Sequence, residues 1–184
     1  SALSFKCGGR VTVYRRSNST HGFVQQGQTI FGDRKYDQFG DMVALSGAGN
    51  IIAVLAQDDV EAFQYDEATN EWVSFGQVIN TAGVGSLALS TDGLTMAIGS
   101  PFELNLRGTV RVYRFQNDTT MRWTQVGQTI EGSHDDTFND GSSLLGGRID
   151  LSGDGLTLAV IQQYDDPNIY RNPREAQVWS LVEE

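Results

Sequence analysis

The sequence contains little cysteine, proline or histidine: one, three and two of them in 184 residues. Because Cys7 stands alone, no disulfide can form within the chain, and the fold must be held together by packing. No apolar run reaches about 18 residues, the length that a membrane-spanning helix needs. We therefore expect no direct insertion into a membrane.

Basic residues are also scarce, with 13 Lys and Arg against 23 Asp and Glu and a net charge of −10. Such a chain repels the phosphates of nucleic acids, so we expect no nucleic-acid partner. Residues 1–5 lack the basic and apolar regions of a signal peptide and do not begin with Met, which favours a processed chain. We expect a secreted or cell-surface location, or alternatively an organelle such as a plastid, reached through a removed targeting segment.

What the sequence does have is a strand pattern that recurs along its length. Residues 45–55, 89–99 and 151–161 each begin with Leu-Ser, pass through a turn sequence and end in an apolar run. A Gly-Gln pair occurs at Gly27, Gly76 and Gly127, and an alternating strand occurs at residues 11–14, 60–63, 110–113 and, more loosely, 176–179. Self-similarity at a regular period indicates a repeat architecture.

These repeats predict an all-β fold of three four-strand units with no helix of useful length. Asp92-Gly93 and Asp154-Gly155 are suited to two-residue hairpin turns, and the continuous apolar run 51–55 is typical of a strand covered on both faces. We expect one domain over 1–184, with units at about 9–59, 60–109 and 110–175 and a closing strand at 176–182. A β-trefoil, which also has three four-strand units, is the alternative fold.

Two insertions in the third unit, residues 132–143 and 162–173, supply candidate sites because binding functions concentrate in loops. The first carries candidate metal ligands at Asp135, Asp136, Asn139 and Asp140, for which a solvated turn is the alternative. In the second, Tyr164, Tyr170 and Arg171 are candidates for a partner-binding surface.

Other residues have simpler interpretations. Asn18 and Asn117 begin glycosylation sequons, which would be used only on a secretory route. His21 and His134 lie in polar loops without a recognisable nucleophile, so we predict no catalytic residue. Aromatic residues at equivalent repeat positions favour shared packing rather than a ligand site: Tyr14, Phe63, Tyr113, Trp179, Trp72 and Trp123.

Residues 37–40, Asp-Gln-Phe-Gly, and 97–101, Ala-Ile-Gly-Ser-Pro, resemble the two halves of an FG-GAP repeat. FG-GAP repeats form the blades of integrin-α-like β-propellers. The order of motifs in this sequence is similar to that of repeats common in predicted proteins of diatoms and related algae. The resemblance implies a propeller-like fold. It does not carry over the calcium site, because residues 90–93 and 152–155 hold one carboxylate each. We expect no cofactor.

These features predict a non-enzymatic protein-interaction or scaffold module, such as a structural or accessory subunit or an adhesion-type protein. It would bind a protein partner or belong to a larger assembly, and a homo-oligomer is also compatible with the repeats. A carbohydrate-binding, lectin-like module is the main alternative, and a hydrolytic enzyme built on a repeat scaffold is a further one.

Overall fold

The structure is a computed structural model that describes residues 8–17, 19, 21–34, 37–133, 143–163 and 174–181. Strands and tight turns make up nearly all of this part, and its one helical segment is the short α1 (Glu103–Leu106). The predicted all-β character is confirmed.

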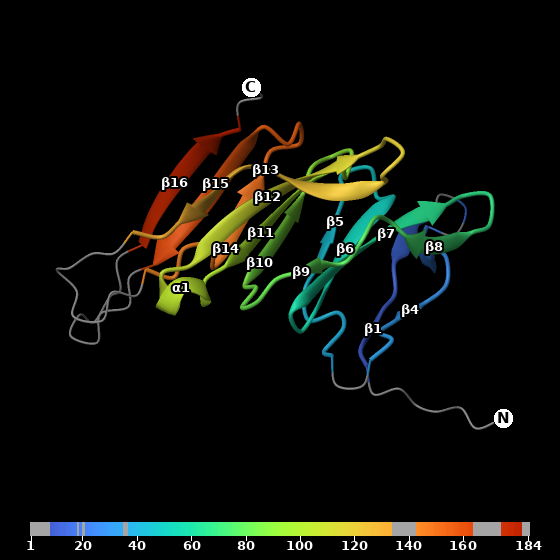
Figure 1. The fold of residues 1–184 in the computed structure, drawn as a ribbon. Helices are drawn as coiled ribbons and strands as arrows, with labels where there is room; N and C mark the ends of the chain where they lie inside the picture. The colour runs from blue at the N-terminus through green and yellow to red at the C-terminus, as the bar shows by residue number, and fades with distance from the viewer. Residues whose placement is uncertain are drawn as a thin grey trace.

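Antiparallel strands form four successive groups that lie side by side in chain order (Figure 1). Sheet 1 contains β1 (Arg10–Val11), β2 (Tyr14–Arg16), β3 (Phe23–Gln25) and β4 (Ile30–Phe31). Sheet 2 contains β5 (Val43–Leu45), β6 (Ile51–Ala56), β7 (Asp59–Asp66), β8 (Glu71–Ser74) and β9 (Ile79–Asn80). Sheet 3 contains β10 (Ser86–Leu89), β11 (Thr95–Ser100), β12 (Thr109–Gln116) and β13 (Arg122–Glu131), and sheet 4 contains β14 (Arg148–Leu151), β15 (Thr157–Gln163) and β16 (Arg174–Ser180).

Only sheets 2 and 3 have all the strands of a repeat. In both, each strand pairs with the next along the chain, and β9 continues the line of β8 beside β7. Among the described residues, sheet 1 has only the strands that correspond to the third and fourth strands of a complete sheet, and in it β1 pairs with β4 and β2 with β3. Sheet 4 has only the strands that correspond to the first three. The described residues therefore do not form three equal four-stranded sheets.

The sheets also begin at different residues from the predicted units. Sheets 2, 3 and 4 start at residues 43, 86 and 148, inside the units predicted at 9–59, 60–109 and 110–175. A periodic sequence has the same period wherever counting begins, so only the hydrogen-bonded partners fix where one sheet ends. The strand predicted to close a ring, β16, pairs with β15, and it lies at the opposite end of the row from β1 (Figure 1).

The hairpin turns are built alike in sheets 2, 3 and 4. Gly49, Gly93 and Gly155 have φ values of 72°, 74° and 73°, a left-handed conformation that favours glycine. In the last two, the Asp before the glycine accepts a hydrogen bond from the backbone N–H two residues on. The predicted turns do lie at Asp92-Gly93 and Asp154-Gly155, but each connection has four residues, because Ser90 bonds to Thr95 and Ser152 to Thr157.

Three apolar cores lie between consecutive sheets. The core between sheets 2 and 3 contains twelve buried residues, among them Ile51, Met96 and Trp123. A second core packs sheet 1 against sheet 2, and a third packs sheet 3 against sheet 4. Because β6 faces a core on each side, all six of its residues are buried, as its continuous apolar sequence predicts.

A repeated clamp, made of a Gly-Gln pair and a Trp, locks neighbouring sheets together. At the interface of sheets 2 and 3, the Gln77 side chain accepts a hydrogen bond from the Trp123 backbone N–H at 2.8 Å and donates one to the Trp123 carbonyl at 2.7 Å. The Trp123 indole N–H donates to the Phe75 carbonyl at 3.0 Å. The interface of sheets 1 and 2 repeats all three bonds with Gln28, Trp72 and the Gln26 carbonyl.

Removing the glutamine should weaken this junction. We expect Gln77→Ala to lower the free energy of unfolding by about 1–2 kcal/mol, because two backbone groups of Trp123 lose their partner. The matched control is Gln128→Ala, the same repeat position in sheet 3, whose side chain makes no hydrogen bond with any residue that the structure describes. Its effect should stay within about 0.5 kcal/mol. Urea denaturation measures both, and equal losses would contradict the clamp.

Candidate interaction site

A groove of about 900 Å³ lies between the outer strands of sheet 3 and the last strand of sheet 4. Its floor comes from β12 and β13, and its far wall comes from β16 and the turn that joins β14 to β15. The apolar side chains that line it are Val112, Val126, Ile130, Leu156, Trp179 and Leu181.

The groove repeats the core between sheets 2 and 3 with its central residue missing. At the equivalent repeat positions, that core has Ala62, Phe75 and Ile79 on the floor and Leu94, Tyr113 and Phe115 on the wall. Trp123 fills the space between them and is 3% exposed. Sheet 4 has no fourth strand among the described residues, so nothing there takes the place of Trp123.

No Trp lies beside Gly127, unlike the two equivalent glycines. Gly27, Gly76 and Gly127 share a left-handed conformation, with φ values of 70°, 79° and 67°. A Cβ atom added to Gly27 or Gly76 would lie 2.7 or 2.8 Å from the Cδ1 atom of Trp72 or Trp123, whereas one added to Gly127 would meet nothing within 4 Å. The third Gly-Gln pair thus has the backbone of the clamp without its Trp.

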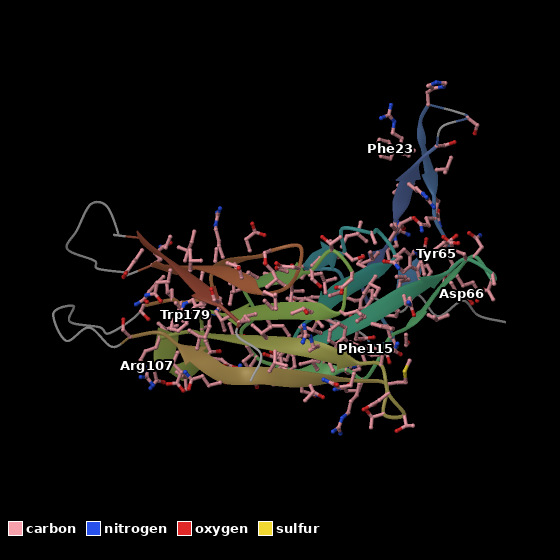
Figure 2. All side chains as sticks on the ribbon, turned by 90° about the horizontal axis from the view of Figure 1, so that it is seen from above. Phe23, Tyr65, Asp66, Arg107, Phe115 and Trp179 are labelled. Atoms are coloured by element: carbon pink, nitrogen blue, oxygen red, sulfur yellow. The ribbon has the colours of Figure 1, made fainter. Side chains whose placement is uncertain are left out.

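Trp179 and β16 border the empty space. Trp179, labelled in Figure 2, occupies the repeat position of the buried Phe63. Nevertheless, 38% of Trp179 is exposed. Beside it, β16 pairs with β15 on one edge, and no other described strand pairs with it. A sheet edge of this kind presents backbone N–H and C=O groups to an incoming strand.

The recurring aromatic residues pack in the cores of sheets 2 and 3, as predicted, but those of sheets 1 and 4 are exposed. Phe63, Trp72 and Trp123 are buried, and Tyr113 packs against the core between sheets 2 and 3. Tyr14 in sheet 1 is 59% exposed, and Trp179 borders the groove. No strand within the described ranges covers these two side chains.

Most of the sequence-predicted site residues lie outside the described part of the chain. These are Asn18, the candidate metal ligands Asp135, Asp136, Asn139 and Asp140, and the candidate contact residues Tyr164, Tyr170 and Arg171. Asn117 is exposed in the turn between β12 and β13, and His21 is exposed between β2 and β3.

Within the described ranges, no three His, Cys, Asp or Glu side chains gather as metal ligands would. No helix described there has the length and apolarity to span a membrane.

Sequence reasoning missed the groove itself. A signal was present, because three Gly-Gln pairs occur but only the first two are followed, in the next repeat, by a Trp at the clamp position. Counting the two motifs against each other identifies Gly127 and Gln128 as unmatched.

One ion pair ties α1 to sheet 3. The Glu103 carboxylate accepts hydrogen bonds from the Arg111 guanidinium and the Thr109 hydroxyl, both at 2.7 Å. Burial opposes ionisation of Glu103, but the hydrogen bonds from Arg111 and Thr109 outweigh it and lower its pKa below the ordinary 4.5.

This lowered pKa predicts a loss of stability in acid. The stabilisation is fully present above pH 4.5 and is lost as the pH falls through the lowered pKa, because the unfolded state binds the proton more tightly. We expect Glu103→Gln to flatten the fall in unfolding free energy between about pH 5 and pH 3. Denaturation at several pH values measures this, with Glu67→Gln in an exposed turn as the control for one lost carboxylate. An unchanged slope would contradict the assignment.

No protein-family model matches the sequence, and no curated protein sequence matches it. Solved structures do resemble the fold. A protein from Bacteroides uniformis assigned as a 6-phosphogluconolactonase has a TM-score of 0.55 at 13% identity, over 94% of this chain and 49% of its own. KlAtg21, solved with the coiled coil of AgAtg16, has a TM-score of 0.55 at 18% identity, over 92% and 47%. Saccharomyces cerevisiae Sqt1 has 0.53 at 11%, over 84% and 37%.

The fold is of the β-propeller type. The chain spans about half or less of the length of these structures. At such identities the similarity concerns the fold alone. In propeller terms, sheets 2 and 3 are complete blades, and sheets 1 and 4 are partial blades.

The glycine of the clamp offers a matched test of the open position. We expect Gly76→Ala to destabilise the protein by about 1–2 kcal/mol more than Gly127→Ala. Both substitutions strain a left-handed backbone, but only the methyl group at position 76 meets Trp123. Chemical denaturation measures the difference, and equal losses would show that Gly127 is as crowded as Gly76.

Proposed function

We propose that this protein is a non-enzymatic protein-interaction module of the scaffold type and that the groove beside β16 receives its partner. The observation that carries the proposal is a preformed apolar groove next to an open strand edge, where every other junction between blades is filled. Apolar clefts with a few placed polar groups are the usual form of a binding site.

The similar structures support this proposal in part. KlAtg21 was solved in complex with a coiled coil, so that propeller-type protein has a protein partner. The Bacteroides uniformis protein favours a different class, because its name is that of an enzyme. We place the chain with the interaction modules because six apolar side chains line its groove beside an open strand edge of the described sheet.

We further propose that the repeats are related to FG-GAP repeats and that the protein is a structural or accessory subunit or an adhesion-type protein. We propose a secreted or cell-surface location, or alternatively a plastid. Glycosylation at Asn117 fits its exposed turn and requires the secretory route.

Native mass spectrometry of the protein isolated gently from its natural source tests the function. We expect a mass shared with at least one other polypeptide, because the groove would be occupied in the cell. A bare monomer that binds sugars on a glycan array would contradict the proposal and support the lectin alternative. A bare monomer that hydrolyses a substrate would support the enzyme alternative.

A further inference from the structure

We propose that the groove takes one extended strand of a separate polypeptide, which pairs with β16 and buries a Trp beside Gly127. This inference rests on the proposed interaction function and names the chemistry of the partner. It follows from two equivalent sites in the same chain that are already filled.

The filled sites define what the slot accepts. At both, a strand crosses the outer edge of a blade and places one Trp against the glycine of the preceding blade. The indole also packs on an aromatic residue of its own blade, with centroids 5.3 Å apart for Trp72 and Tyr65 and 5.4 Å apart for Trp123 and Phe115. Trp72 and Trp123 are each 3% exposed, so the slot encloses a whole indole.

The open slot offers the same chemical groups. Gly127 leaves space for the ring, and Leu181 replaces Phe115 as the surface on which the ring would pack. The Val126 carbonyl corresponds to those of Gln26 and Phe75, which accept the indole N–H at 2.8 and 3.0 Å. Gln128 corresponds to Gln28 and Gln77, whose side chains bond both backbone groups of the Trp.

The open edge of β16 supplies the remaining interactions. In blade 3, β12 pairs with the Trp-bearing strand in register, with Phe115 opposite Trp123. On the same register, Leu181 would lie opposite the partner's Trp. Main-chain hydrogen bonds would then provide affinity, and the indole slot would provide specificity, as in other cases of strand addition.

None of the Trp residues within 1–184 is available for the slot. The chain has three Trp residues: Trp72 and Trp123 fill the two clamps, and Trp179 forms a wall of the groove. Phe23 occupies the equivalent position in sheet 1 and is 75% exposed, on a hairpin that stands out from the rest of the fold (Figure 2). It lacks the indole N–H, and its strand already pairs with β2. A second copy is therefore a poorer occupant than a separate Trp-bearing strand.

A labelled peptide with the sequence of residues 120–131, which contains Trp123, is a suitable probe. We expect fluorescence anisotropy to show saturable binding to the full chain. Replacing the Trp of the peptide by Ala should weaken binding about 30-fold, the effect typical of an anchor residue. In the protein, Gln128→Ala should weaken binding about five- to tenfold. Gln125→Ala on the same strand, outside the groove lining, should leave it unchanged.

Three results would overturn the inference: no binding of the Trp peptide, equal binding of the Ala peptide, or equal effects of Gln128→Ala and Gln125→Ala. Sedimentation velocity of the protein alone provides a fourth. Self-association abolished by Phe23→Ala would make a second copy the occupant. A natural partner found by native mass spectrometry, together with a failed peptide assay, would refute the strand and leave the interaction function standing.

Discussion

The clamp between blades is the interaction on which the rest of the structure depends. Each blade is a small sheet that cannot bury its own faces, and stability comes from packing one sheet on the next. A Trp of one blade fills the space beside a left-handed glycine of the blade before it, and a Gln holds the backbone of that Trp. The same three residues thus set the spacing and the register of neighbouring blades.

A repeat of this kind makes the first and last described sheets unequal. The clamp joins Gln28 to Trp72 and Gln77 to Trp123, which lie 44 and 46 positions further along, and the third Gly-Gln pair has no such partner among the described residues. The groove beside β16 is the space that corresponds to the one filled by Trp72 and Trp123 at the other two junctions. Its walls belong to strands that the core between sheets 3 and 4 holds in place.

The groove lies between sheets 3 and 4, and none of its lining residues belongs to the two insertions of the third unit. The insertions of the third unit suggested a partner surface at Tyr164, Tyr170 and Arg171, which lie outside the described residues. Those three remain predictions. The groove is lined by ordinary repeat residues. Its apolar side chains have counterparts one repeat earlier that are buried in, or pack against, the core between sheets 2 and 3.

The sequence by itself determined the all-β class, the positions of the hairpin turns and the buried strands. Those features depend on local pattern: Asp-Gly in a hairpin turn, and an unbroken apolar run at residues 51–55. Only the tertiary structure decided where each sheet begins, that β16 pairs with β15, and that Gly127 faces open space. These facts depend on which strands meet across roughly fifty residues of chain, and a periodic sequence allows more than one such pairing.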